Sequence, residues 1–80
     1  ISTGYDEVVV RGNPVPGESF SVWHFRDGRL LAVDAVNDPI SFGVGRKLIP
    51  TGDCPPHDMI RDTSIATKSL LEAATEPSNA

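Results

Sequence analysis

The 80-residue sequence has one cysteine, Cys54, and no long apolar segment. A single cysteine cannot form an internal disulfide, and it is typical of a reducing, cytoplasmic setting. No apolar run approaches the roughly 18–20 residues that a membrane-spanning helix needs. A basic-then-apolar secretory signal is also missing, and the first residue is Ile1 rather than methionine. We therefore expect a cytoplasmic domain whose start is a cleavage, a cloning boundary or an incomplete sequence.

Basic residues are scarce as well. Seven lysines and arginines stand against eleven aspartates and glutamates, which gives a formal net charge of −4. Residues 1–50 hold five basic and six acidic residues, and residues 51–80 hold two and five. Phosphate backbones and anionic membrane surfaces both select clustered lysine and arginine. The composition therefore argues against nucleic acid and membranes as partners.

Eighty residues allow one small domain, because a chain of this length buries only about 60% of its extended surface. Asp6–Arg11 contains three consecutive valines and predicts a β-strand. Gly12–Gly17 contains two prolines and two glycines and predicts a surface loop.

A β-hairpin is predicted next, from Ser19–Phe25 and Leu30–Val36. Asp27-Gly28, in the connection between them, supplies the positive φ angles of a two-residue type I′ turn. Alternation along the first strand places Ser21, Trp23 and Phe25 on one face, and Phe20, Val22 and His24 on the other. Both faces carry large apolar groups, so we expect cover on both sides, from helices of this chain and from another domain.

A helix is predicted to begin at Asp38-Pro39, because Asp38 can accept hydrogen bonds from free N–H groups and Pro39 suits the first position. Ile40, Val44 and Leu48 form its expected apolar stripe. Two glycines, Gly43 and Gly45, weaken it by about 1 kcal/mol each relative to alanine. They indicate that something packs closely against this helix, with a poorly optimised helix as the alternative.

The last third of the sequence carries weaker signals of secondary structure. Residues 53–58 are expected to be irregular, Met59–Arg61 to form a single turn, and Thr63 or Ser64 to cap a helix from Ile65 to Ala74. Residues 75–80 are expected to be a frayed tail. We therefore predict one α+β domain over residues 1–80, with a small antiparallel sheet of about three strands, including a β-hairpin, followed by two helices.

Chemistry-bearing residues are few. Cys54 and His57 could be read as a nucleophile and base, or with Asp53 and Asp58 as metal ligands, but the spacing matches no closed zinc site and a surface loop is favoured. Gly43-Val44-Gly45 begins like a dinucleotide-binding fingerprint, but the third glycine is missing and the segment lies inside a predicted helix. We assign no catalytic, cofactor-binding or metal-ligating residue to this chain.

Four residues are predicted to contribute to an interface: Trp23, His24, Arg46 and Lys47. Tryptophan often anchors interfaces, although core packing is the favoured alternative for Trp23. A half-buried polar neighbour is the favoured alternative for His24. Arg46 and Lys47 also complement the dipole at the end of their predicted helix.

Several segments together resemble a known family: Tyr5–Gly12, Ser19–Asn37, Pro39 and Arg46–Ile49. Their order and spacing resemble the C-terminal domain of bacterial FAD-dependent ferredoxin reductases, which are related to putidaredoxin reductase and apoptosis-inducing factor. These enzymes are the reductase components of cytochrome P450 and ring-hydroxylating dioxygenase systems. The resemblance covers residues 5–50, and residues 51–80 fit the family less distinctly.

The resemblance implies a parent enzyme that moves hydride from NADH or NADPH to FAD and then single electrons to a ferredoxin. FAD and the nucleotide bind two other domains, and this domain covers the flavin side and contributes to the docking surface. On this reading the chain is inert alone. The alternative is a stand-alone α+β protein-interaction module without redox activity.

The sequence departs from that family in two ways. The family's aromatic motif near the flavin and its first strand precede the position of Tyr5, so no flavin-contact residue is carried over. Asp38 stands where the family commonly has a basic residue, which would weaken or redirect contact with an acidic ferredoxin. Without the preceding strand, Asp6–Arg11 would be an exposed sheet edge. We therefore predict self-association through this strand.

Overall fold

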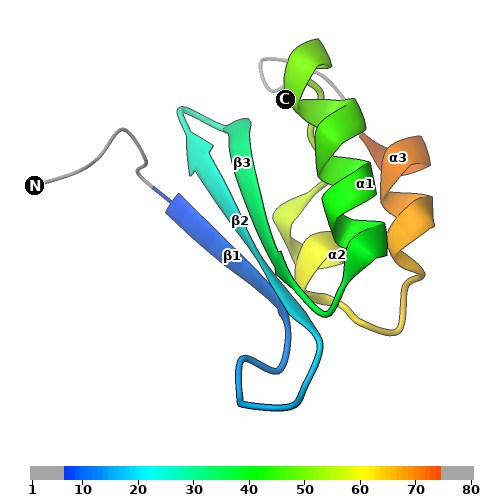
Figure 1. Cartoon of the computed structure of the whole chain (residues 1–80). Coiled ribbons are helices and arrows are strands. Elements are labelled where there is room, and N and C mark those ends of the chain that lie inside the picture. Colours follow the sequence, from blue (N-terminus) through cyan, green and yellow to red (C-terminus); the bar gives the residue numbers. More distant parts are fainter. Residues whose placement is uncertain (1–6, 75–80) are drawn as a thin grey trace, which may run out of the picture.

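A three-stranded antiparallel sheet and three short helices make up the fold in this computed structural model, which describes residues 7–74 (Figure 1). In chain order the elements are β1 (Glu7–Gly12), β2 (Phe20–Arg26), β3 (Arg29–Val36), α1 (Pro39–Leu48), a 3-10 turn (Ile49–Thr51), α2 (His57–Arg61), a second 3-10 turn (Thr67–Ser69) and α3 (Leu70–Ala73). The predicted α+β class is confirmed, and the single turn predicted at Met59–Arg61 is the short helix α2, which begins at His57 within the segment predicted to be irregular. Asp6 and the predicted tail 75–80 lie outside the described residues.

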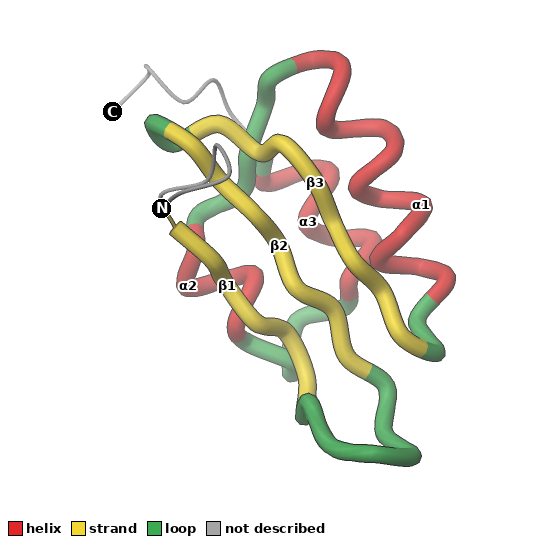
Figure 2. The backbone as a smooth tube through the Cα atoms, turned by 60° about the vertical axis from the view of Figure 1, so that its left-hand side comes forward, coloured by secondary structure: helices red, strands yellow, loops and turns green. Residues whose placement is uncertain are grey.

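The strands follow one another across the sheet in the order β1-β2-β3. Asp27 and Gly28 have φ angles of 52° and 79°, which confirms the predicted turn. Trp23 pairs with Val9 on one side and Val33 on the other, and a bulge next to His24 shifts the register toward the turn. All three helices lie on one face of this sheet (Figure 2).

The hydrophobic core lies between the sheet and the helices. The predicted division of β2 is confirmed, because Ser21, Trp23 and Phe25 are fully buried. The core is built from the following buried side chains: Val9, Trp23, Phe25, Leu30, Val44, Leu48, Cys54, Ile60 and Leu70. None of the helices between residues 7 and 74 has the length and apolar character for crossing a bilayer.

A chain of hydrogen bonds joins the sheet to the start of α1. The indole Nε1 of Trp23 donates to Ser21 Oγ at 2.8 Å, Ser21 Oγ donates to Ser41 Oγ at 3.2 Å, and Ser41 Oγ donates to Asp38 Oδ2 at 2.6 Å. The backbone N–H of Ser41 also donates to Asp38 Oδ1, at 3.1 Å. Asp38 is therefore the N-cap that the sequence predicts, and its carboxylate continues a buried polar network.

The expected apolar stripe of α1 is wrong at Ile40, which is 48% exposed. The buried residues of the helix are Ser41, Val44, Gly45 and Leu48. The helix is rotated because Gly45, without a side chain, allows the backbone of α1 to approach Val33 on β3. Close packing is thus confirmed for Gly45. An added Cβ at Gly43 would find no atom of the described part of the chain within 4 Å.

Arg11 on β1 holds residues 59–67 against the sheet through hydrogen bonds. Its side chain is buried, and its guanidinium donates to the backbone carbonyls of Met59, Ile60, Asp62 and Ile65 and to Thr67 Oγ1. These carbonyls include the free C-terminal groups of α2, which a cation stabilises.

The last helix starts later than predicted. Residues 62–66 form a turn whose carbonyls face Arg11, so the helical segment begins at Thr67 rather than Ile65. Ser64 does not cap a helix, since its N–H and Oγ donate to Asp62 Oδ1 at 3.0 and 2.6 Å. These hydrogen bonds lower the pKa of the Asp62 carboxyl.

Candidate interaction surfaces

The four predicted interface residues lie in three different places. Trp23 is fully buried in the core, in agreement with the core packing that was favoured over an interface role. In this conformation it exposes no surface to a partner. His24 lies on the opposite face of the sheet, where its Nε2 is 2.8 Å from Asp34 Oδ2. Arg46 and Lys47 lie on α1 and are exposed. The structure therefore brings only Arg46 and Lys47 together.

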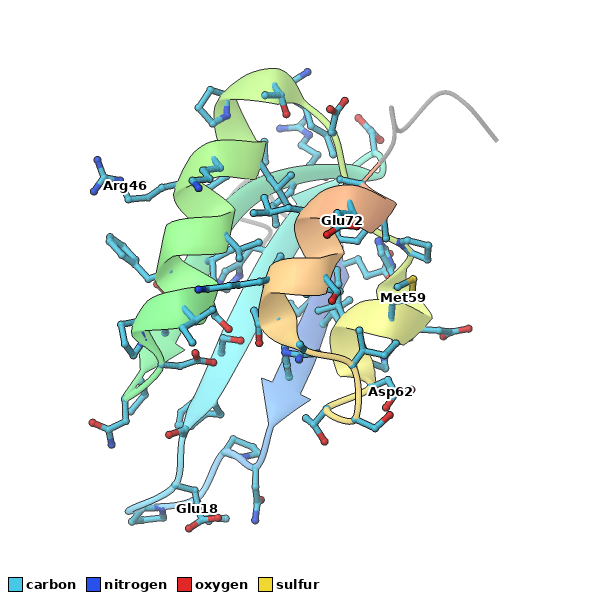
Figure 3. All side chains as sticks on the ribbon, turned by 90° about the vertical axis from the view of Figure 1, so that its right-hand side faces the viewer. Glu18, Arg46, Met59, Asp62 and Glu72 are labelled. Atoms are coloured by element: carbon cyan, nitrogen blue, oxygen red, sulfur yellow. The ribbon has the colours of Figure 1, made fainter. Side chains whose placement is uncertain are left out.

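Phe42 adds an exposed aromatic ring to this part of α1. The ring is 52% exposed, and the guanidinium carbon of Arg46 lies 5.9 Å from its centroid. Figure 3 shows Arg46 directed away from the rest of the domain. A cation above an aromatic ring in solvent forms a preorganised contact for a partner. Phe42 was not predicted, although its spacing of four residues from Arg46 on a helix was visible in the sequence.

A groove lies beside it, between α1 and the segment that begins with the second 3-10 turn. Its volume is about 300 Å³, and its lining comprises Ile40, Gly43, Val44, Lys47, Lys68 and Leu71. Two lysines thus border an apolar surface. Sequence reasoning missed this groove because Lys47 and Lys68 belong to different elements. We call the groove, together with Phe42 and Arg46, the basic α1 face.

The loop before α2 has no reactive geometry. Burial, and to a lesser extent the charge of Glu7, raises the pKa of the Cys54 thiol to about 11. His57 Nδ1 lies 3.0 Å from Glu7 Oε2, and its ring packs 4.3 Å from that of Phe25. The cysteine is therefore a neutral thiol at pH 7, and the histidine contacts Glu7 and Phe25. Over residues 7–74, no cluster of three or more histidine, cysteine or acidic side chains could hold a metal ion.

The predicted glycine pattern on α1 can be compared with a dinucleotide-binding turn. Every buried side-chain nitrogen or oxygen in this part of the chain has a hydrogen-bond partner. Gly43 and Gly45 lie inside α1 rather than between a strand and a helix, and Gly45 packs against Val33.

Residues 1–71 match the protein family described as reductase C-terminal. The chain belongs to this family. The predicted resemblance to the C-terminal domain of bacterial ferredoxin reductases is therefore confirmed. The chain is 34% identical to putidaredoxin reductase of Pseudomonas putida over 74 residues, which are 92% of this chain and 17% of that protein.

Two further relatives in this family carry related names. A probable ferredoxin reductase of Castellaniella defragrans is 46% identical over 65 residues, covering 81% of this chain and 16% of the relative. The ferredoxin–NAD(+) reductase component of the anthranilate 1,2-dioxygenase system of Burkholderia cepacia is 38% identical over 64 residues, covering 79% and 16%. The chain thus spans about one sixth of the length of these relatives. No solved structure matches it significantly.

Proposed function

We propose that this chain is the C-terminal domain of a cytoplasmic FAD-dependent NAD(P)H:ferredoxin reductase that supplies electrons to a P450 or dioxygenase system. Family membership and the names of the relatives support the parent activity. FAD and NAD(P)H bind the other domains of the parent enzyme. This domain covers the flavin side and offers a docking surface for the iron–sulfur partner.

The basic α1 face is the observation that carries the docking role. Three of the seven basic residues of an acidic chain, Arg46, Lys47 and Lys68, gather around it. Clustered cations steer an acidic partner and increase its association rate. Phe42 and the groove supply apolar contact beside these charges. A charged rim around an apolar centre is the usual composition of a transient protein interface.

Gly43 gives independent support. A glycine inside a helix costs about 1 kcal/mol relative to alanine, and here no atom of residues 7–74 fills the space above it. Gly43 borders the groove, with Lys47 beside it. A missing Cβ at this position lets a partner approach the backbone of α1 closely.

Asp38 lies at the opposite end of α1 from the basic residues proposed for docking. Its carboxylate lies at the N-terminal end of α1 and accepts two hydrogen bonds from Ser41, whereas Arg46 and Lys47 are in the last turn. The expectation that Asp38 weakens or redirects ferredoxin contact stays a prediction. The structural role of an acidic residue at this position is to cap α1.

The test uses the full-length reductase that contains this chain and an acidic ferredoxin that it reduces. Lys47→Glu places a like charge opposite the partner, and we expect kcat/KM for ferredoxin to fall at least about tenfold, which is about 1.4 kcal/mol. Arg26→Glu, at the exposed hairpin end of β2 and outside the basic α1 face, is the matched control and should leave this value within about twofold. Reduction of ferricyanide by NAD(P)H reports the flavin site and should be unchanged in both variants.

An equal effect of both substitutions would contradict the assignment of docking to the basic α1 face. A full-length protein that binds no flavin and oxidises neither NADH nor NADPH would overturn the reductase itself. In that case the stand-alone interaction module is the better description.

A further inference from the structure

Two adjoining hollows on the surface of α1 share the backbone of Gly43. The first is the groove described above, about 300 Å³ in volume, with Ile40 and Leu71 in its apolar lining. The second has a volume of about 340 Å³ and is lined by Gly43, Arg46 and Lys47. Figures 1 and 3 show α1 and α3 side by side at this surface. Because Gly43 and Lys47 border both hollows, an apolar groove and a cationic hollow lie next to each other.

The cations of this surface are unpaired. Arg46, Lys47 and Lys68 form no ion pair with any acidic residue between positions 7 and 74. Glu72 follows Lys68 by four residues, a spacing that favours pairing on a helix, yet the two are not paired in this part of the chain. The guanidinium of Arg46 lies over the Phe42 ring instead, 5.9 Å from its centroid. In a chain with a net charge of −4, such a cluster of free cations favours an anionic ligand.

We propose that this surface binds a small organic monocarboxylate, with the carboxylate beside Arg46 and Lys47 and the apolar body in the groove, and that the bound acid competes with ferredoxin. The competition rests on the proposed function, because it requires the basic α1 face to be the docking surface. A bound carboxylate neutralises the cations that attract an acidic partner. Its apolar body also fills the groove that the partner would contact. An organic acid that accumulates therefore slows the reduction of ferredoxin.

The volume of the groove sets the size of the apolar body. Sites for small molecules commonly enclose about 300–1,000 Å³, so this groove is at the lower limit and suits a single substituted ring or a short branched chain. Ile40 is 48% exposed and gains apolar cover from such a group. An added Cβ at Gly43 would find no described atom within 4 Å, so a flat ring can lie against the backbone of α1.

A carboxylate fits these cations better than a phosphate does. Phosphate sites commonly use the free backbone N–H groups at the N-terminus of a helix. At that end of α1, Asp38 already accepts the N–H of Ser41, whereas Arg46 and Lys47 belong to the last turn, where the free backbone groups are carbonyls. Side chains alone therefore hold the anion. The planar guanidinium of Arg46 can bind a carboxylate with two hydrogen bonds.

The test measures binding of para-tert-butylbenzoate to the full-length reductase that contains this chain. A ligand-observed NMR titration gives the dissociation constant, and we expect about 0.1–1 mM for about a dozen non-hydrogen atoms in an open groove. The neutral para-tert-butylbenzamide has nearly the same shape and should bind at least about tenfold more weakly. With an acidic ferredoxin as the acceptor, the benzoate should raise the KM for ferredoxin and leave kcat unchanged.

Three variants locate the probe. Gly43→Leu fills the space between the two hollows and keeps the cations, so it should raise the dissociation constant at least about tenfold and abolish the inhibition. Leucine is a good helix former and the space above Gly43 is open, so this variant should fold. Lys68→Gln should raise the dissociation constant about two- to fivefold, the effect of one exposed ion pair. Arg26→Gln, outside the basic α1 face, is the matched control and should leave it within about twofold.

An enzyme whose ferredoxin reduction depends on Lys47, but which binds the benzoate no more tightly than the amide, would overturn this inference and leave the proposed function intact. Binding that is unchanged in Gly43→Leu would also overturn it, because the probe would then lie elsewhere. Binding that is lost in Gly43→Leu, without any effect of the probe on the KM for ferredoxin, would retain the carboxylate site and contradict ferredoxin docking at the basic α1 face.

Discussion

Gly45 on α1 and Val33 on β3 are packed so closely that a Cβ on the glycine would lie 2.7 Å from Val33 Cγ2 and 3.0 Å from Val33 Cβ. Among the residues that the structure describes, Gly43, two residues earlier on the same helix, has no such neighbour. The two glycines therefore lie on the same helix but have different structural roles. One sets the distance between helix and sheet, and the other leaves open space on the surface.

Alanine substitutions at these two glycines should have opposite effects on stability. Gly45→Ala forces α1 away from Val33 and should lower the free energy of unfolding by about 1–3 kcal/mol. Gly43→Ala should raise it by about 0.5–1 kcal/mol, because alanine is the better helix former and fits without contact. Urea unfolding followed by far-UV circular dichroism measures both values. Destabilisation by Gly43→Ala would show that another element lies above this glycine.

Replacing Ser21 should lower the unfolding free energy more than the small size of its side chain suggests. Ser21→Ala leaves the buried indole N–H of Trp23 without its acceptor, and we expect a loss of about 1–3 kcal/mol in unfolding free energy. Ser19→Ala removes an exposed hydrogen bond to the Asn37 carbonyl and should cost less than about 0.5 kcal/mol. Trp23 is the only tryptophan, so its fluorescence reports the unfolding of both variants. Equal costs would mean that the Trp23 N–H finds another acceptor.

Stability should fall in alkaline solution because of Cys54. Burial raises the pKa of this thiol from 9.0 to about 11. Between pH 9 and pH 11 the unfolded chain therefore releases a proton that the folded chain keeps, so the unfolding free energy decreases as pH rises. The full contribution is present below pH 9. Comparing pH-dependent thermal unfolding of the protein with that of Cys54→Ala isolates the effect, which should vanish in the variant.

Arg11→Met should destabilise the domain by about 3 kcal/mol, because it leaves several backbone carbonyls near α2 without a donor. Methionine keeps most of the apolar volume, so packing alone should not account for the loss. Arg26→Met, at an exposed position at the end of β2, should change stability by no more than about 0.5 kcal/mol. Hydrogen exchange should accelerate first in residues 57–67 of the Arg11 variant. Unchanged exchange there would contradict the role given to this arginine.

Self-association through the first strand stays a prediction. Within residues 7–74, β1 is an outer strand of the sheet and pairs with β2 alone, and such an edge invites pairing with another chain. We expect sedimentation analysis of the 80-residue chain to show a concentration-dependent oligomer, or a crystal to show β1 paired with a neighbour. A monomer with this edge ordered and unpaired would contradict the expectation.

The sequence predicted well wherever the signal was local. Asp27-Gly28 fixed the hairpin because few other residue pairs adopt two positive φ angles, and Asp38-Pro39 fixed the start of α1. Both features depend on backbone groups within four residues. The division of β2 into two faces also followed from alternation alone.

Other features depend on residues that the fold brings together from distant positions. Nothing near Arg11 in the sequence reveals that it binds carbonyls of residues 59–65, and without that knowledge the start of the last helix was placed too early. The rotation of α1 depends on Val33, so periodicity wrongly assigned Ile40 to the core. The groove needed both Lys47 and Lys68, and the single residues gave no signal.

Arg11 also determines when this domain can close during synthesis. Its acceptors lie 48–56 residues further along the chain, so β1 leaves the ribosome long before the groups that accept hydrogen bonds from its buried guanidinium. Until residues 59–67 have emerged, this guanidinium must stay in water, and the sheet can pair only locally. The hairpin and α1 can form early, but the segment from α2 onward is added last. A ribosome stalled before residue 59 should therefore display a sheet whose helix-facing side is still uncovered beside β1.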